Sequence, residues 1–124
     1  MKIKDLVGFQ LVDLDNERMI VKKGKQEFTL SFNRDYGDCC GYTNVENALC
    51  FDRTNTKRNP VIANVEYSNG DSEDQSDVKI TFFGENKKIA EVSADAGSGS
   101  GWNYGANVTV SCNALGINET IVQW

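Results

Sequence analysis

Alternation of apolar and polar residues constrains this 124-residue chain more than any other feature of its sequence. It is clearest in residues 28–32, 61–67, 78–83 and 108–112. Successive side chains of a strand point to opposite faces, so a period of two is typical of half-buried antiparallel strands. Glycine and asparagine separate these segments and favour the positive φ angles of tight turns.

Weaker patterns predict further strands near residues 6–14, 17–22 and 88–93. Helix is scarce: one turn is expected at residues 4–7 and a second at residues 43–49, capped by Thr43 or Asn44. We therefore expect a single domain over residues 1–124. It is mainly β, with antiparallel sheets arranged like a sandwich and one or two short helices.

The charge balance and the missing histidine exclude several classes of function. The chain has 18 acidic and 13 basic residues and a net charge of −5, which argues against general affinity for nucleic acid. Without histidine it lacks the commonest general base near neutral pH and every Ser-His or Cys-His nucleophile. No apolar run is long enough for a signal peptide or a membrane span. We expect a cytoplasmic protein that is not an enzyme and needs no cofactor or metal.

Cys39 and Cys40 are adjacent, which ordinary cysteine chemistry does not explain. Neighbouring side chains of a strand diverge, so the two thiols cannot reach one metal ion without a bend. Structural zinc sites use ligands two to four residues apart, and only Cys50 and Cys112 remain to complete a set. We interpret the pair as small packing residues at a tight chain crossing, and expect all four cysteines to be free thiols.

Carboxylates concentrate in residues 71–77, which we interpret as a solvated hairpin loop. Calcium loops place ligands at alternate positions and a glutamate at the twelfth, and this segment does not have that spacing. An acidic protein that imitates nucleic acid would instead spread its carboxylates along one face.

Residues 96–105 combine glycines with Trp102, Asn103 and Tyr104. Glycine lets the backbone approach a ligand closely, and aromatic rings stack on bases. The segment matches neither the dinucleotide fingerprint nor the P-loop. Two interpretations stay open: a hairpin loop whose rings fold back on the core, or a loop that lines a ligand site or contacts another subunit.

Arg53, Lys57 and Arg58 form a basic cluster in residues 53–59, a segment that contains no acidic residue. Such side chains bind phosphate through charge-assisted hydrogen bonds, although most clusters of this kind belong to solvated loops. Phe82 and Phe83 are adjacent, so one of the two rings is expected to point away from the core. An outward ring of this kind is typical of a subunit interface or a stacking platform.

Several short motifs occur in a characteristic order. They are Asp5-Leu6-Val7-Gly8, Asp38-Cys39-Cys40, Asn59-Pro60-Val61-Ile62, Thr81-Phe82-Phe83 and a glycine-aromatic segment before a final strand. In this order they resemble a small phage and prophage family that is similar to the anti-Thoeris proteins. Members commonly carry a histidine before the cysteine pair and glutamate with aromatic residues after it. Asn33-Arg34-Asp35 and Gly41-Tyr42-Thr43 stand there instead.

The resemblance implies a phage protein in the host bacterial cytoplasm that sequesters a cyclic ADP-ribose isomer without cleaving it. It also implies a homo-oligomer, a dimer or an assembly of dimers, with pockets near the subunit contacts. Capture of such a ligand needs cations, a stacking ring and neutral hydrogen-bonding groups. The candidate ligand-binding residues are Arg53, Lys57, Arg58, Phe82, Phe83, Trp102, Asn103 and Tyr104.

Two other functions remain open at this point. The negative charge and the exposed aromatic residues also suit an acidic inhibitor that binds a bacterial defence enzyme. A structural β-domain without any ligand is the third possibility. None of the three requires a nucleic acid or a membrane as partner.

Overall fold

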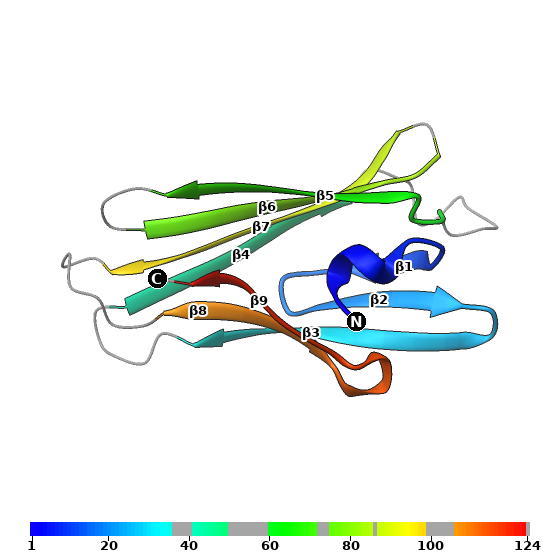
Figure 1. The fold of residues 1–124 in the computed structure, drawn as a ribbon, viewed down its shortest axis with the longest axis horizontal. Coiled ribbons are helices and arrows are strands. Elements are labelled where there is room, and N and C mark those ends of the chain that lie inside the picture. The colour runs from blue at the N-terminus through cyan, green and yellow to red at the C-terminus, as the bar shows by residue number, and fades with distance from the viewer. Residues whose placement is uncertain (36–40, 50–59, 72–74, 86, 99–105, 124) are drawn as a thin grey trace.

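The computed structural model describes residues 1–35, 41–49, 60–71, 75–85, 87–98 and 106–123, and in these ranges it contains nine strands and two short 3-10 helices (Figure 1). The strands are β1 (Gln10–Leu14), β2 (Arg18–Lys23), β3 (Gln26–Asp35), β4 (Gly41–Leu49), β5 (Asn64–Asp71), β6 (Gln75–Phe83), β7 (Lys88–Ser98), β8 (Asn107–Cys112) and β9 (Ile117–Gln123). The helices are η1 (Ile3–Leu6) and η2 (Asn113–Leu115). Among the described residues, no helix has the length and apolar character needed to cross a membrane.

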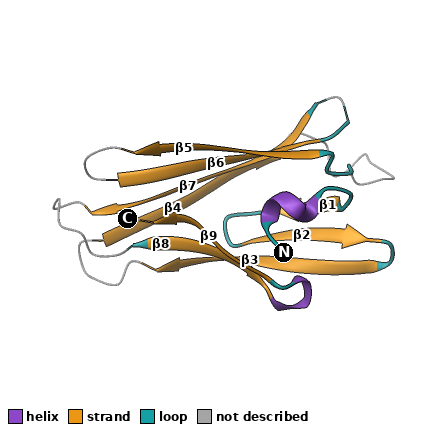
Figure 2. Cartoon of the chain, in the orientation of Figure 1, coloured by secondary structure: helices purple, strands orange, loops and turns teal. Residues whose placement is uncertain are grey.

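The strands form two antiparallel sheets. The five-stranded sheet has the order β1-β2-β3-β8-β9, and the four-stranded sheet has the order β4-β7-β6-β5. The sheets pack on each other, with β7 and β6 close to β9 and β4 close to β3 (Figure 2). The prediction of a mainly β protein with antiparallel sheets is confirmed.

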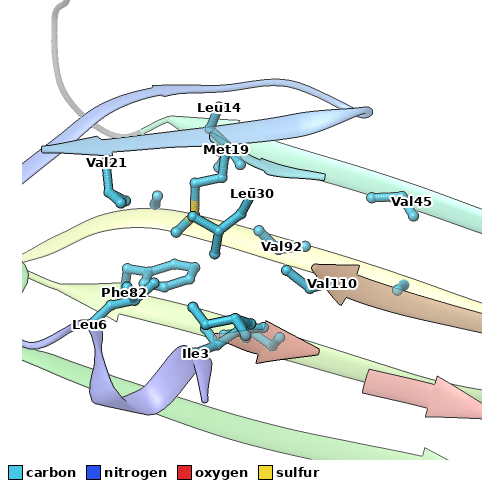
Figure 3. Packing of buried hydrophobic residues seen from close by; sticks show 14 of the residues in the cluster. Ile3, Leu6, Leu14, Met19, Val21, Leu30, Val45, Phe82, Val92 and Val110 are labelled. Carbon is cyan, nitrogen blue, oxygen red and sulfur yellow. The ribbon is translucent and has the colours of Figure 1, made fainter. Parts of the chain in front are cut away.

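The core lies between the two sheets, where their apolar faces meet. In β8 the alternation is complete, because Val108, Val110 and Cys112 are buried while the residues between them are partly exposed. Cys112 is a free, buried thiol. Leu30, Val92 and Val110 meet in this interior, together with Ile3 and Leu6 of η1 (Figure 3).

Residues 60–62 connect the two sheets along the edge of β1. The amide of Leu11 donates to the carbonyl oxygen of Pro60 over 2.9 Å, and the amide of Ile62 donates to the carbonyl oxygen of Phe9 over 2.8 Å. Pro60 contributes only its carbonyl group here, so its missing N–H leaves no donor unpaired. The segment therefore closes this edge and leads the chain into β5.

Glu119 links the two sheets to η1 through both of its carboxylate oxygens. Oε1 accepts a hydrogen bond from the backbone N–H of Ile3, and Oε2 accepts one from the hydroxyl of Tyr67, each over 2.9 Å. Burial raises the pKa of Tyr67, and the hydrogen bond to Glu119 raises this pKa further. A single inward-facing carboxylate of β9 thus fixes both the N-terminal helix and strand β5.

The prediction of a helical turn at residues 43–49 was wrong, because these residues belong to β4. Thr43 and Val45 are buried, whereas Asn44 and Glu46 are exposed, which is the alternation of a strand. Nine consecutive pairs with β7 outweigh the helix propensity of Glu46, Ala48 and Leu49. The other predicted turn exists as η1, shifted by one residue.

Three other segments differ from the predicted boundaries. The first strand begins at Gln10 rather than near Leu6, since η1 precedes it. The acidic segment is less of a loop than predicted, because Asp71 ends β5 and β6 begins at Gln75. Strand β7 continues to Ser98 and therefore includes the start of the glycine-rich segment. Cys39, Cys40 and Cys50 lie outside the described residues.

Candidate functional site

The outer face of the four-stranded sheet carries a shallow hollow of about 390 Å³. Strands β4, β7 and β6 contribute its lining side by side: Asn44, Glu46, Asp77, Val78, Lys79, Ser93, Ala94 and Asp95. The register explains the grouping. Asn44 pairs with Asp95, which pairs with Asp77, and the next outward row consists of Glu46, Ser93 and Lys79.

The hollow is acidic, with three carboxylates and one ammonium group in its lining. Lys79 lies 3.3 Å from Glu91, measured from Nζ to Oε1, so part of its charge is already balanced by a carboxylate next to the hollow. The Lys88 ammonium, and then that of Lys79, lower the pKa of Glu91. The surface potential over the hollow is therefore negative.

Asp77 and Asp95 stand directly opposite each other on neighbouring strands. Like charges in this position destabilise a sheet. Two features reduce the repulsion. The side-chain amide of Asn44 donates to Oδ1 of Asp95 over 2.9 Å. On the other side, Asp77 extends over Gly70, where a Cβ atom would lie only 2.6 Å from its Oδ1.

This geometry suits a cationic group better than an anionic one. Phosphate oxygens placed beside Glu46, Asp77 and Asp95 would meet charges of the same sign. The one described cation of the lining, Lys79, already has the carboxylate of Glu91 as its partner. The described residues also contain no group of three or more His, Cys, Asp or Glu side chains able to hold a metal ion. The hollow is consequently not the place for a nucleotide.

The two adjacent phenylalanines occupy opposite faces of the four-stranded sheet. Phe82 is 1% exposed and belongs to the core, so it offers no ring to a ligand. Phe83 is partly exposed, and the register between β6 and β7 shifts between the two residues. Of the predicted pair, only Phe83 stays a candidate for stacking.

The other predicted ligand-binding residues lie outside the described residues: Arg53, Lys57, Arg58, Trp102, Asn103 and Tyr104. Their described neighbours in the chain are attached at opposite ends of the sheet (Figure 1). Leu49, just before the basic segment, pairs with Ala90, whereas Gly41 pairs with Ser98, the last described residue before Trp102. Ala90 and Ser98 are separated by about 26 Å of strand at about 3.3 Å per residue.

Phe83 lies at the same end of the sheet as Leu49. The register places Phe82 beside Ala90, and Ala90 beside Leu49. The structure thus groups Phe83 with the attachment point of the basic segment. It separates both from the attachment point of the glycine-aromatic segment.

The acidic hollow was not predicted from the sequence. Its residues come from the consecutive strands β6 and β7 and from β4, which lies far from them along the chain. The sequence drew attention instead to the charge-rich stretch at residues 71–77. Only the end of that stretch, Asp77, lines the hollow. The sequence shows which residues of each strand point outward, but only the strand order shows that those of β4, β7 and β6 lie side by side.

Searches against protein-family models, curated proteins and solved structures find no match to this chain. Its functional interpretation therefore rests on the sequence motifs, the fold and the distribution of charged and aromatic side chains.

Proposed function

We propose that this protein is a phage anti-defence protein that binds and sequesters a cyclic ADP-ribose-type nucleotide without cleaving it. Removal of such a messenger from the host cytoplasm would block a Thoeris-type immune response. The proposal is supported by the order of the short motifs, from Asp5-Leu6-Val7-Gly8 to the glycine-aromatic segment. Retention requires affinity rather than a catalytic base, so the absence of histidine from the sequence is compatible with it.

The observation that carries the proposal is the position of Phe83. Its ring is partly exposed on an outer sheet face, at the end where the chain enters and leaves the basic segment through Leu49 and Pro60. A ring that stacks on adenine and side chains that bind a pyrophosphate belong together in such a ligand site. Arg53, Lys57 and Arg58 are the proposed phosphate ligands.

Trp102, Asn103 and Tyr104 are proposed as a second contact group. Because their described neighbours are attached at the other end of the sandwich, a pocket that uses both groups is most simply completed by a second subunit. A homo-oligomer is therefore part of the proposed function. If the messenger is present at nanomolar concentration, capture needs a binding free energy of about 12 kcal/mol, which a deep pocket reaches more readily than a flat surface.

Isothermal titration with cyclic ADP-ribose isomers tests this function. The wild-type protein is expected to bind one isomer tightly and to lose at least tenfold in affinity when Phe83 is changed to Leu, which keeps an apolar side chain but removes the ring. Ile20→Leu on the outer face of the other sheet is the matched control and should bind normally. No heat of binding with any isomer would refute the proposal.

A second candidate function is supported by the acidic hollow itself. Glu46, Asp77 and Asp95 form a negative outer face of the kind that an inhibitor presents to a basic surface of its target enzyme. The test is capture of a bacterial protein from lysate in stoichiometric amount. This function is favoured over sequestration if the wild-type protein captures such a partner and binds no nucleotide, and if the Asp77→Asn/Asp95→Asn variant no longer captures the partner.

A further inference from the structure

The four edges of the two sheets differ in how they are protected. Residues 60–62 pair with the edge of β1. Strand β9 has one extra residue, Ile121, where its register with β8 shifts, and such bulges disfavour pairing with another strand. Strand β4 lies against the five-stranded sheet, because it contacts β3 and β1 and its Asn47 side-chain amide donates to the backbone oxygen of Asp15.

Strand β5 has none of these protections in the described part of the chain. Its eight residues pair with β6 without any shift of register. It contains no proline and no lysine, the residues that commonly blunt an edge. Every second residue of an edge strand presents its N–H and C=O groups away from the sheet, so β5 offers a regular row of donors and acceptors.

Apolar side chains are also exposed beside this edge. Tyr67 of β5 is 36% exposed, and Val7, which follows η1, is 48% exposed. η1 contacts β5, whereas β9 of the five-stranded sheet lies below β6 and β7. Glu119 of β9 approaches Tyr67 on the inner face of the sheet, but within the described residues β5 pairs only with β6, so its outer edge is open to an additional strand.

We propose that β5 pairs with β5 of a second copy of this chain, antiparallel and around a twofold axis at Tyr67. The two four-stranded sheets then become one continuous eight-stranded sheet, and the exposed rings of the two Tyr67 residues cover each other. A twofold contact of this kind uses the same surface on both copies.

Charge and side-chain direction select this register. Pairing must match inward residues with inward residues, so the axis passes through a residue and not between two. An axis at Glu66 would place two carboxylates opposite each other. An axis at Ser68 would place Asp71 opposite the apolar Val65. With the axis at Tyr67, Glu66 faces the neutral, exposed Ser68 of the other copy.

The assembly belongs to the proposed function, but the assignment of the edge does not depend on nucleotide binding. The test therefore uses the full-length protein without nucleotide, in analytical ultracentrifugation over a series of micromolar concentrations. The wild-type protein is expected to form dimers, or larger assemblies built from them.

Three variants test the register. Ser68→Glu places a carboxylate opposite Glu66 twice in each dimer and is expected to weaken dimerisation about tenfold. Combining it with Glu66→Lys restores opposite charges and is expected to recover the dimer. Ser31→Glu, on the exposed outer face of β3, changes the net charge equally and should leave dimerisation unchanged.

A wild-type protein that is monomeric throughout the series would overturn the proposal. So would equal behaviour of Ser68→Glu and Ser31→Glu, or a double variant that stays weak. A dimer with this charge response but no nucleotide binding would support the interface while removing the proposed function. Nucleotide binding by a monomer would overturn the interface and the oligomeric part of the proposed function while supporting sequestration itself.

Discussion

The outer faces of the two sheets differ sharply although their inner faces are alike. On β3, β8 and β9 the outward residues are mostly neutral: the Asn33 amide donates to the Ser111 hydroxyl over 2.8 Å, and the hydroxyls of Thr109 and Thr120 lie 3.2 Å apart. The centre of the four-stranded sheet instead presents carboxylates around a hollow. Apolar alternation therefore specifies the sandwich, while the outward half of each strand is free to differ and carries the functional information.

The largest effect is expected from comparing the two faces of one strand. Phe82→Ala removes a fully buried ring and should lower the free energy of unfolding by about 3–5 kcal/mol. Phe83→Ala should lower the free energy of unfolding by about 1 kcal/mol or less, because folding buries less apolar surface at this partly exposed residue. Urea denaturation of both variants measures the difference, and equal losses would contradict the assigned faces.

The next effect concerns the link between the sheets. In the unfolded chain the pKa of Tyr67 is about 10, the ordinary value for tyrosine. Burial together with the hydrogen bond to Glu119 raises this pKa in the folded protein. Above about pH 10 the unfolded chain loses this proton first, so stability should fall as pH rises. Thermal unfolding between pH 8 and pH 11 should show a shallower loss for Tyr67→Phe than for wild type. Parallel curves would argue against the raised pKa.

Glu119→Gln provides a companion measurement of the same link. The neutral amide keeps the size of the side chain but weakens the hydrogen bonds to Ile3 and Tyr67, so a loss of about 1–2 kcal/mol is expected. Hydrogen exchange should report faster opening of η1 in this variant. Unchanged exchange at Ile3 would contradict the assignment.

The opposed carboxylates sharpen the comparison of the two outer faces. Asp95→Asn should stabilise the protein by about 0.5 kcal/mol at low salt, because it removes the like charge facing Asp77, and high salt should reduce the gain. Conversely, Thr109→Asp combined with Thr120→Asp introduces an opposed carboxylate pair into the neutral face and should destabilise it. Failure of both variants to respond to salt would mean that the faces do not differ electrostatically.

The smallest effect is expected at Gly70. Its replacement by Ala forces the Asp77 carboxylate to move, and the free energy lost should be smaller when Asp77 is already Ala. A double-mutant cycle measures this coupling. Additive effects would show that Gly70 does not accommodate Asp77.

The sequence predicts the fold better than it predicts the site. Apolar and polar residues alternate in residues 28–32 and 108–112, because one face of each strand is buried. Both segments lie in strands of the five-stranded sheet. The helical turn predicted at residues 43–49 was wrong because Glu46, Ala48 and Leu49 favour helix locally. The strand depends on pairing with β7, which is distant along the chain. The hollow depends on a strand order in which β7 separates β4 from β6, and no local pattern encodes that order.

The adjacent phenylalanines show where residue-level reasoning succeeds and where it stops. Adjacency in a strand is enough to place one ring outward, and the burial of Phe82 identifies Phe83 as the outward ring. Arg53, Lys57, Arg58, Trp102, Asn103 and Tyr104 lie outside the described residues, so their role in ligand binding stays a prediction.

Retention of an intact nucleotide tests the central claim most directly. The purified protein is incubated with a cyclic ADP-ribose isomer, washed free of unbound ligand and denatured by heat, and the released small molecules are analysed by mass spectrometry. We expect intact nucleotide in near-stoichiometric amount from wild type and much less from Phe83→Leu. Recovery of no nucleotide, or of a hydrolysed product, would contradict sequestration.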